Sequence, residues 1–302
     1  MLYKARKEST ELLTLRFLNR RMELEEKDRQ YYLNLEKGFE GERQFDKYTE
    51  KLKCDCLVLN DLRLSVTNTT FQIDALVITD ETAFLFEVKN HEGDFYLDRD
   101  RIYYRKNKSE VSNPLIQLQR CESLFRQLIH SLGLSLSVTA FVVFIHPEFT
   151  LYQAPLNLPI LFPTQLNRFF KELNTLPSKL SGKHKKLADK LLSLHMEKTP
   201  YTKLPTYKFE QLRKGIICTA CGAFACNAEG RHIVCRNCGQ EEDIYSAIFR
   251  TIQEFRLLFP EQKMTTAMMK EWCKIIESNS SIRKVLEDHF KTVGKGRWAY
   301  YC

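Results

Sequence analysis

Apolar residues along this chain follow two different spacings, which divide the sequence into helical and strand-like segments. Leucines and aromatic residues between positions 12 and 24 recur at helical intervals. From residue 56 onward, short runs rich in β-branched and aromatic residues predict strands at 56–63, 71–79, 82–90, 94–97, 101–104, 139–145 and 158–162. Helical patterns occupy residues 1–37, 40–52, 114–131, 163–196, 241–259, 265–277 and 281–290. This order predicts an α/β fold in which helices cover a small mixed sheet.

Charged residues interrupt the two strand segments that flank residues 80–81, where most neighbouring residues are apolar. A two-residue turn at 80–81 pairs the strands so that Asp74 lies opposite Glu87 and Gln72 lies opposite Lys89. Because side chains alternate along a strand, Asp74, Glu87 and Lys89 then project from the same face. The sequence therefore predicts a cluster of two carboxylates and one ammonium group within an otherwise apolar hairpin.

Two carboxylates that face each other across a pair of strands repel, and apolar surroundings strengthen that repulsion. A divalent cation relieves it, and hard oxygen ligands suit Mg²⁺ or Mn²⁺. We therefore expect Asp74 and Glu87 to bind one of these ions. The alternative is an ordinary hairpin with charges at its frayed end, because a slip of one residue in the register would disperse the three side chains.

An Asp and a Glu-x-Lys on adjacent strands resemble the PD-(D/E)xK nuclease superfamily, although no proline precedes Asp74. Flanking motifs narrow the resemblance to the nuclease-related domain family, NERD. Upstream, Gly38, Gly41 and Glu42 form a Gly-x-x-Gly-Glu motif, and downstream residues 113–117 read Asn-Pro-x-x-Gln. The resemblance extends from Gly38 to the end of the second motif, and we expect the supporting fold to reach about residue 175.

The resemblance implies a nuclease that hydrolyses phosphodiester bonds with Mg²⁺ or Mn²⁺ and acts on nucleic acid, with DNA the expected substrate. In such a site Asp74 and Glu87 hold the metal, which activates a water molecule and neutralises phosphate charge. Lys89 orients the attacking water or stabilises the transition state. Glu42 contacts the metal through water or completes a second ion site, and Gln117 positions water or phosphate. The implied core is a mixed β-sheet flanked by helices.

Two Cys-x-x-Cys-Gly motifs in the last third of the chain predict a structural zinc site. The expected ligands are Cys218, Cys221, Cys235 and Cys238. Their separation suits a compact hairpin like that of a zinc ribbon, and each following glycine helps the backbone turn tightly around the metal. A redox role is the alternative. Cys226 and His232 lie between the two motifs and are expected not to bind the ion.

Basic residues concentrate in one part of the 302-residue chain, whose formal net charge is +8. Residues 163–217 contain 12 Lys or Arg and 4 Asp or Glu, an excess of 12 − 4 = 8 that equals the surplus of the whole chain. Basic charge gathered in one region indicates a polyanionic partner, or equally a solvated helix face.

The 10 cysteines occur without a secretory signal, which predicts reduced thiols or metal ligands in a cytoplasmic protein. Apolar runs stay well short of the ~20 residues that span a bilayer, so we expect no membrane partner. The N-terminal helices are compatible with packing on the nuclease core or with self-association into a homo-oligomer. A DNA-processing partner protein is also compatible with the sequence.

These features predict an N-terminal helical segment (1–37), a NERD nuclease-like domain (38–175), a basic helical segment and linker (176–212), a zinc ribbon (213–242) and a C-terminal helical module (243–302). In the last segment, helices followed by a Gly-rich basic hairpin at 291–301 resemble a helix-turn-helix or winged-helix DNA-binding domain. A helical packing module accounts for the same pattern. Two other functions stay open: a non-catalytic nucleic-acid-binding protein with a degenerate nuclease fold, and a zinc-containing regulatory or scaffold protein.

Overall fold

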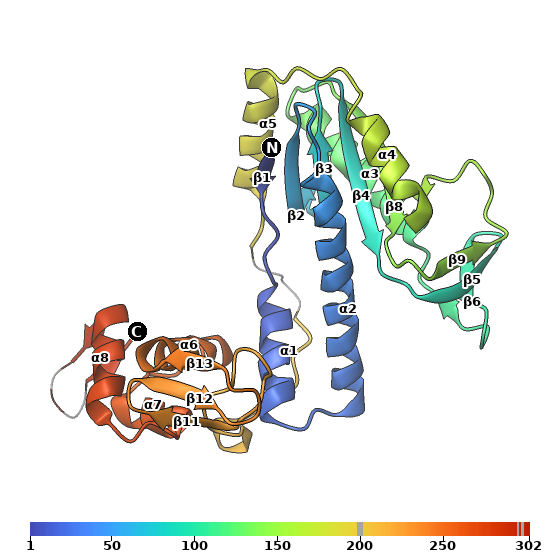
Figure 1. Ribbon diagram of the computed structural model, residues 1–302. Coiled ribbons are helices and arrows are strands. Elements are labelled where there is room, and N and C mark those ends of the chain that lie inside the picture. The colour runs from blue at the N-terminus through green and yellow to red at the C-terminus, as the bar shows by residue number, and fades with distance from the viewer. Residues whose placement is uncertain (198–201, 295, 297–298) are drawn as a thin grey trace. The chain divides into compact units, whose positions relative to one another are not determined.

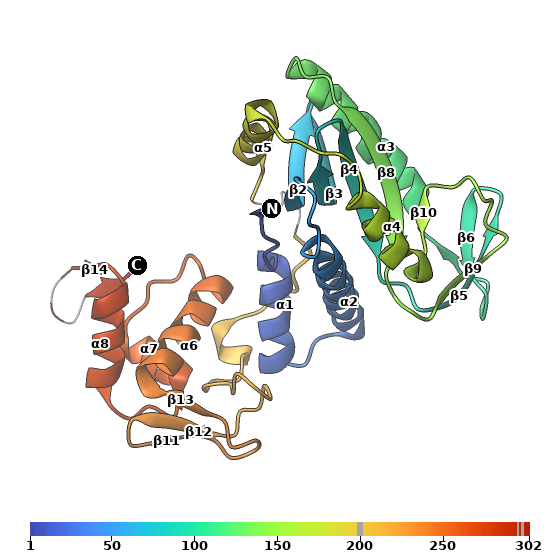
Figure 2. The same cartoon turned by 45° about the horizontal axis from the view of Figure 1, so that its top comes forward.

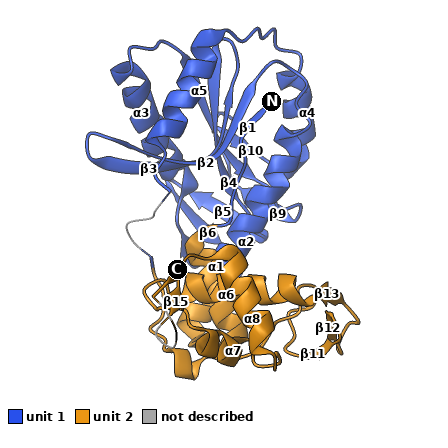
Figure 3. Ribbon diagram, turned by 90° about the vertical axis from the view of Figure 1, so that its left-hand side faces the viewer, with its two compact units in different colours: residues 1–8, 33–202 blue, residues 9–32, 203–302 orange. Residues whose placement is uncertain are grey.

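The computed structural model describes residues 1–197, 202–294, 296 and 299–302. The chain forms two compact units (Figure 3): unit one comprises residues 1–8 and 33–202, and unit two comprises residues 9–32 and 203–302. Parts of the expected linker at 199–205 and of the expected closing hairpin at 291–301 lie outside the described residues. None of the described helices is long and apolar enough to cross a membrane.

A six-stranded mixed sheet forms the centre of unit one (Figure 1), in the order β1-β2-β3-β4-β8-β10. Its middle strands β2, β3 and β4 are antiparallel, whereas β1, β8 and β10 run parallel to their neighbours. The strands are β1 (Leu2–Lys4), β2 (Leu57–Val66), β3 (Thr69–Ile78), β4 (Thr82–Lys89), β8 (Ser137–Phe144) and β10 (Ile160–Leu161). With helices on both faces, this sheet confirms the predicted α/β class.

Adjacent residues of β4 show which helices cover which face of the sheet, because they point to opposite sides. Phe86 packs on Phe45 of α2 (Glu26–Thr49), with ring centroids 5.0 Å apart, and α4 (Leu166–Leu173) lies on the same face. Leu85 belongs to the opposite core, which is closed by α3 (Pro114–Ser131) and α5 (Gly182–Leu194). A short 3-10 helix, Pro163–Gln165, leads into α4.

The N-terminus of α3 begins as the sequence predicts. Asn113 caps the helix by accepting a hydrogen bond from the Leu115 amide (2.9 Å), and Pro114 occupies the first turn, where its missing N–H is not needed. This cap determines where the helix starts, and Gln117 therefore lies in its first turn.

A second, four-stranded sheet in unit one follows directly after β4, and Figure 2 shows it grouped to one side of the main sheet. Its order is β7-β6-β5-β9. The strands are β5 (Gly93–Asp98), β6 (Arg101–Tyr104), β7 (Glu110–Val111) and β9 (Phe149–Tyr152). The sequence predicts β5 and β6, but β7 and β9 are too short for their apolar spacing to reveal them.

Unit two combines α1 (Thr10–Arg21) with the cysteine-rich segment and the C-terminal helices around one core. Trp272 and Phe255 are fully buried at its centre, with ring centroids 5.6 Å apart. Its other elements are a 3-10 helix (Phe209–Gln211), β11 (Cys226–Glu229), β12 (His232–Cys235), β13 (Glu241–Asp243), α6 (Ile244–Leu258), α7 (Thr266–Cys273), α8 (Asn279–His289), β14 (Thr292–Val293) and β15 (Tyr300–Tyr301).

The N-terminal segment differs from the uniformly helical one that the sequence predicts. Leu2–Lys4 is a strand, paired in parallel with β2, and only the part from Thr10 onward is helical. A partner more than fifty residues away determines this strand, so local spacing cannot show it. Arg21 at the end of α1 forms a buried ion pair with Glu254 of α6, which attaches α1 to the core of unit two.

Candidate active site and zinc centre

The register of the β3–β4 hairpin is the one obtained by counting across residues 80–81. Ala75 lies opposite Phe86, Ile78 lies opposite Ala83, and the Thr79 amide donates to the Thr82 carbonyl at 2.9 Å. The ladder ends at the pair Ala75 and Phe86, and Asp74 and Glu87 are the next residues along the two strands.

The two strands separate at Asp74, and here the structure corrects one expectation. The Asp74 carboxylate, through Oδ2, accepts a hydrogen bond from the Val88 amide at 2.8 Å, in place of a further backbone pair. The ladder between β3 and β4 ends at Ala75 and Phe86, so the expected pairing of Gln72 with Lys89 is not part of it. On its other side Gln72 pairs with Arg63 of β2, and Gln72 and Lys89 both line the same hollow. The fork places a buried carboxylate between two diverging strands.

Asp74, Glu87 and Lys89 project from the face of the sheet that α3 covers. Ala83 and Leu85 belong to the core on that face, and alternation along β4 carries Glu87 and Lys89 to the same side. The Lys89 ammonium contacts Glu87 Oε1 at 2.6 Å and Gln117 Oε1, on α3, at 3.2 Å. The predicted hairpin cluster and the predicted Gln117 therefore meet in space.

Burial disfavours the ionised form of the carboxylates in this cluster. Asp74 is 7% exposed and Glu87 is 3% exposed. Burial and the neighbouring Asp74 raise the pKa of Glu87 to about 7, against the opposing effect of Lys89. Burial also raises the pKa of Asp74, although Lys89 and the Val88 amide favour its ionised form. A bound cation would lower both pKa values by stabilising the carboxylates.

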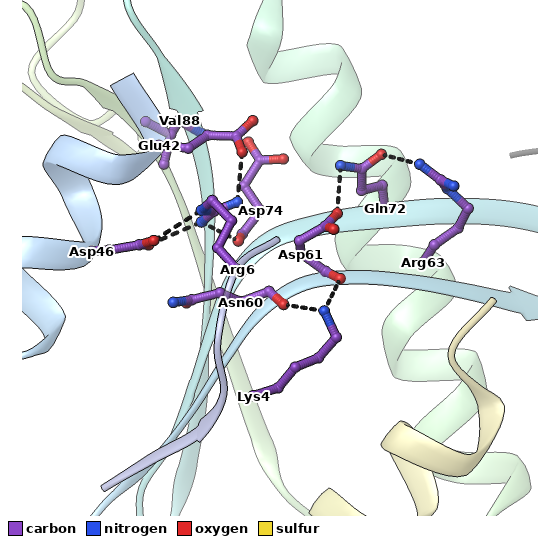
Figure 4. A network of polar contacts seen from close by, with 10 residues as sticks. All are labelled: Lys4, Arg6, Glu42, Asp46, Asn60, Asp61, Arg63, Gln72, Asp74 and Val88. Atoms are coloured by element: carbon purple, nitrogen blue, oxygen red, sulfur yellow. Dashed lines mark hydrogen bonds and ion pairs between the residues drawn. The ribbon is translucent and has the colours of Figure 1, made fainter. Parts of the chain in front are cut away.

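Glu42 lies beside the cluster on α2 and is held by Arg6, a residue to which the sequence assigns no role (Figure 4). The Arg6 guanidinium contacts Glu42 Oε2 at 2.6 Å, both oxygens of Asp46 at 2.9 and 3.0 Å, and the Asp74 carbonyl at 2.8 Å. Burial and Asp74 raise the pKa of Glu42 to about 8, whereas Arg6 opposes the shift. Arg6 precedes Asp74 by 68 positions, so no local motif links them.

A hollow of about 510 Å³ brings all five predicted catalytic residues together: Glu42, Asp74, Glu87, Lys89 and Gln117 line it. The carboxylate oxygens of Asp74, Glu87 and Glu42 do not all lie within 4.8 Å of one another, whereas four cysteine sulfurs elsewhere do. Two carboxylates with room for water suit Mg²⁺, which usually keeps several waters and takes one or two protein carboxylates.

Asn90, directly after β4, is a further polar residue in the lining of this hollow. Its Nδ2 donates to the Lys37 carbonyl at 2.8 Å. Its Oδ1 is buried and has no hydrogen-bond partner among the described protein groups. An unsatisfied buried oxygen beside two carboxylates fits a site that receives water or a cation.

Gly41 of the Gly-x-x-Gly-Glu motif allows α2 to approach the end of β4. A Cβ atom at this position would lie 2.5 Å from Asn90 Cβ, 3.0 Å from Asn90 Cγ and 3.2 Å from Ile145 Cγ2. At Gly38, on the same helix, a Cβ would meet no other side chain or strand of the described residues within 4 Å. The motif thus has one glycine that packing requires and one that it does not.

We expect Gly41→Ala to destabilise unit one by about 1–3 kcal/mol, because the added methyl overpacks a close contact. The matched variant Gly38→Ala should stabilise the helix by up to about 1 kcal/mol, since alanine is the better helix former. Urea denaturation of both variants measures the difference. Equal effects of the two substitutions would contradict the packing role of Gly41.

The four predicted zinc ligands form one cluster in unit two. The Sγ atoms of Cys218, Cys221, Cys235 and Cys238 all lie within 4.8 Å of one another, and the 218–238 and 221–235 pairs are each 3.6 Å apart. Tetrahedral bonds of about 2.3 Å to zinc place sulfurs about 3.7 Å apart, so the geometry fits that ion.

The two cysteine motifs have the same backbone geometry. Gly222 donates to the Cys218 carbonyl at 3.0 Å, and Gly239 donates to the Cys235 carbonyl at 2.8 Å. Their φ angles are +72° and +75°, a region that favours glycine. Cys226 lies opposite Cys235 across the β11–β12 ladder, but its sulfur is not part of the cluster.

The chain is similar to a known protein family over part of its length. The model of NERD, the nuclease-related domain family, matches residues 37–145, a range that holds all five residues of the hollow predicted to act in catalysis. No curated protein matches the sequence. Among solved structures, the crystal structure of protein VC1899 from Vibrio cholerae aligns with 50% of this chain and 36% of its own, at 11% identity and a TM-score of 0.24.

Proposed function

We propose that the region matching the NERD family at residues 37–145 is a divalent-metal-dependent nuclease that hydrolyses phosphodiester bonds of nucleic acid, with DNA the expected substrate. The convergence of Asp74, Glu87 and Lys89 at the fork between β3 and β4 carries this proposal. Apolar side chains would pack these two strands equally well, and burying these charges destabilises the fold. A catalytic role accounts for them.

Asp74 and Glu87 are the residues that would hold Mg²⁺ or Mn²⁺, and such an ion supplies an activated water and neutralises charge on the phosphate. Burial is the largest single influence and lowers the pKa of Lys89, but the carboxylates of Glu87, Asp74 and Glu42 together raise it above its ordinary value. Lys89 is therefore an ammonium group at neutral pH, suited to stabilising negative charge and unsuited to removing a proton. Gln117 holds this ammonium from α3 and so positions it.

Cleavage assays on labelled single- and double-stranded DNA and RNA, with and without Mg²⁺ or Mn²⁺, test the proposal. We expect cleavage of at least one substrate that requires the added metal. Binding to nucleic acid without cleavage in any metal would support a non-catalytic binding protein. Absence of binding at low salt, where phosphate contacts are strongest, would support a regulator or scaffold.

The raised pKa values predict how pH affects stability without added Mg²⁺. Because Glu42 and Glu87 have pKa values of about 8 and about 7 in the folded state and 4.5 ordinarily, the folded state binds more protons between those values. The free energy of unfolding should therefore fall as pH rises from about 5 to about 8. Mg²⁺ binds the ionised carboxylates, so its stabilising effect should grow over the same range.

Thermal unfolding of unit one at pH 6 and pH 8, with and without Mg²⁺, measures this effect. The increase in Tm on adding Mg²⁺ should be larger at pH 8, and Glu87→Gln should reduce the difference. An equal increase in Tm on adding Mg²⁺ at pH 6 and pH 8 would contradict carboxylates that are protonated at the lower pH.

Unit two offers a second surface for nucleic acid, because a hollow of about 920 Å³ is lined mostly by basic residues. These are Arg213, Lys214, Lys270, Lys274 and Arg283, with Glu271 as an acidic neighbour.

One lining residue, Lys274, lies in a tight turn between α7 and α8 and has φ +60° and ψ −52°. The Ile275 amide donates to the Cys273 carbonyl at 2.7 Å and closes this turn. This turn is strained for a residue other than glycine, which fits a functional position. We propose that the zinc ribbon supports this basic hollow and that the hollow binds phosphates.

We expect Lys270→Ala and Arg283→Ala each to weaken nucleic-acid binding irrespective of sequence and to reduce the slope of log Kd against log salt by about 1. Fluorescence anisotropy at several salt concentrations measures both quantities. Lys284→Ala, which changes the next residue of α8 outside the hollow, is the matched control. If the slope is unchanged in both Lys270→Ala and Arg283→Ala, the phosphates do not bind in this hollow.

We further propose that the protein is cytoplasmic, because its cysteines form no disulfide among the described residues, and both thiols and cysteine metal ligands stay reduced in that compartment.

A further inference from the structure

Three tyrosines form a row across the small sheet of unit one. Tyr96 of β5 lies directly opposite Tyr103 of β6 on one side and Tyr152 of β9 on the other. Residues paired in this way project from the same face of a sheet. The rings of Tyr96 and Tyr103 are stacked, with centroids 5.3 Å apart and an interplanar angle of 20°. We call this surface the tyrosine face.

The tyrosine face points away from the core. Phe95 and Leu97, which flank Tyr96 along β5, are buried in the core of unit one, so alternation turns Tyr96 outward. Tyr152 is 43% exposed at the edge of the row. A large aromatic side chain on the outside of a short edge strand is available for contact with a ligand.

Polar groups surround the rings and form a shallow binding surface. The Arg105 guanidinium lies 5.1 Å from the centroid of the Tyr152 ring. A hollow of about 450 Å³ is lined by Tyr96, Asp98, Arg105, Tyr152 and Gln153. It therefore combines flat aromatic faces, a cation, a carboxylate acceptor and an amide that both donates and accepts.

Structural packing accounts for only part of this arrangement. A cross-strand tyrosine pair stabilises neighbouring strands, and this explains the stacked Tyr96 and Tyr103. It does not explain why Tyr152 extends the row while half exposed, or why Gln153 adopts a φ of +60° directly after it. Such backbone geometry in a residue other than glycine is strained and is common at binding sites.

We propose that the tyrosine face binds unpaired bases of single-stranded nucleic acid by stacking, with Arg105 contacting the backbone or a base. This inference rests on the proposed function, because the phosphodiesterase site of the same unit indicates the kind of ligand. Every base has a flat π face, so a row of aromatic rings binds single strands with little sequence preference. Bases within a duplex are already stacked on each other and cannot bind in this way.

The position of the face suits a strand that also enters the candidate active site. β4 ends at Lys89 and β5 begins at Gly93, so Tyr96 lies seven positions after Lys89 in the chain. Their Cα atoms are therefore at most about 25 Å apart. Arg101, two residues before Tyr103 on β6, projects from the same face and is exposed, with an ion pair to Glu110 at 3.2 Å. A single strand a few nucleotides long could contact both places.

Fluorescence anisotropy with a labelled oligothymidine of about 12 nucleotides, without divalent cations, tests this proposal on the full chain. We expect Tyr152→Ala and Tyr103→Ala each to raise the Kd by about 5- to 140-fold, the range that loss of one stacked base implies. Tyr152→Trp should bind as well as wild type, because it keeps the aromatic face. A strand of the same length without bases should bind all these proteins equally.

Tyr245→Ala in α6 is the matched control, since that tyrosine is 38% exposed and lies in unit two. Circular dichroism and thermal unfolding establish that the variants are folded. The proposal is overturned if the folded Tyr152→Ala variant binds oligothymidine as tightly as wild type does. It is also overturned if Tyr152→Trp binds as weakly as Tyr152→Ala, or if the strand without bases loses affinity to the same extent.

Measuring binding without metal separates this proposal from the proposed nuclease activity. A protein that binds single strands through the tyrosines but cleaves nothing would support the tyrosine face and contradict the nuclease. A protein that cleaves in Mg²⁺, with oligothymidine binding unaffected by the tyrosine substitutions, would show the reverse.

Discussion

Replacing Lys89 with alanine is expected to reduce the rate of strand cleavage by at least about 10²- to 10³-fold, the usual effect of removing one charge-stabilising group from an active site. The Lys89 ammonium lies on the α3 face of the fork, 2.6 Å from Glu87. The nearby Arg6 is already committed to Glu42, Asp46 and the Asp74 carbonyl. Arg6 therefore cannot replace Lys89.

Single-turnover cleavage of a labelled strand under saturating protein measures this effect, because it isolates the chemical step from product release. Lys186→Ala, which removes an exposed lysine from α5, is the control and should cleave like wild type. Circular dichroism and zinc content should be unchanged in both variants. A Lys89→Ala rate within a few-fold of the wild-type rate would remove Lys89 from the proposed site.

Loss of zinc is expected to unfold unit two. The ribbon contributes buried Cys218, Cys235 and Ile233 to the same core as Trp272. Structural zinc supplies an apparent ~10–16 kcal/mol in small domains, comparable to the whole stability of a domain. We therefore expect Cys235→Ser to lose the ion and to expose the interior of unit two, while unit one, which has its own cores, stays folded.

Zinc content by mass spectrometry and tryptophan fluorescence together measure this outcome. The chain has two tryptophans, Trp272 and Trp298, and Trp272 is fully buried in the core of unit two, so a change in its emission reports on that unit. Cys226→Ser changes a buried ribbon cysteine outside the sulfur cluster and should keep zinc. A folded, zinc-bound Cys235→Ser variant, or equal loss of zinc from Cys226→Ser, would contradict the predicted set of ligands.

The parts of the structure that the sequence predicts well are those determined by short-range spacing. Counting across residues 80–81 gives the hairpin register, since a two-residue turn leaves a single pairing of the strands. The zinc ligands follow from two short motifs that each place two thiolates on one ion. The start of α3 follows from Asn113 and Pro114, whose backbone preferences are local.

The parts that the sequence does not predict depend on partners far apart in the chain. Arg6 reaches the acidic cluster only because β1 pairs with β2 and brings the N-terminus to the fork. Tyr152 joins Tyr96 only because β9 pairs with β5. At the fork, the Val88 amide donates to the Asp74 side chain and not to a backbone carbonyl of β3. The alternation of side chains along a strand does not predict which of these acceptors an amide uses.

The central claim is that the carboxylates at the fork support metal-dependent cleavage, and nicking of supercoiled plasmid DNA by wild type and Asp74→Asn tests it most directly. Asparagine keeps the shape of Asp74 and the acceptor for the Val88 amide but removes the charge that a cation needs. We predict that wild type nicks the plasmid in Mg²⁺ and not without it, and that Asp74→Asn does not nick it in Mg²⁺. Equal nicking by the two proteins, or wild-type nicking that needs no metal, would contradict the claim.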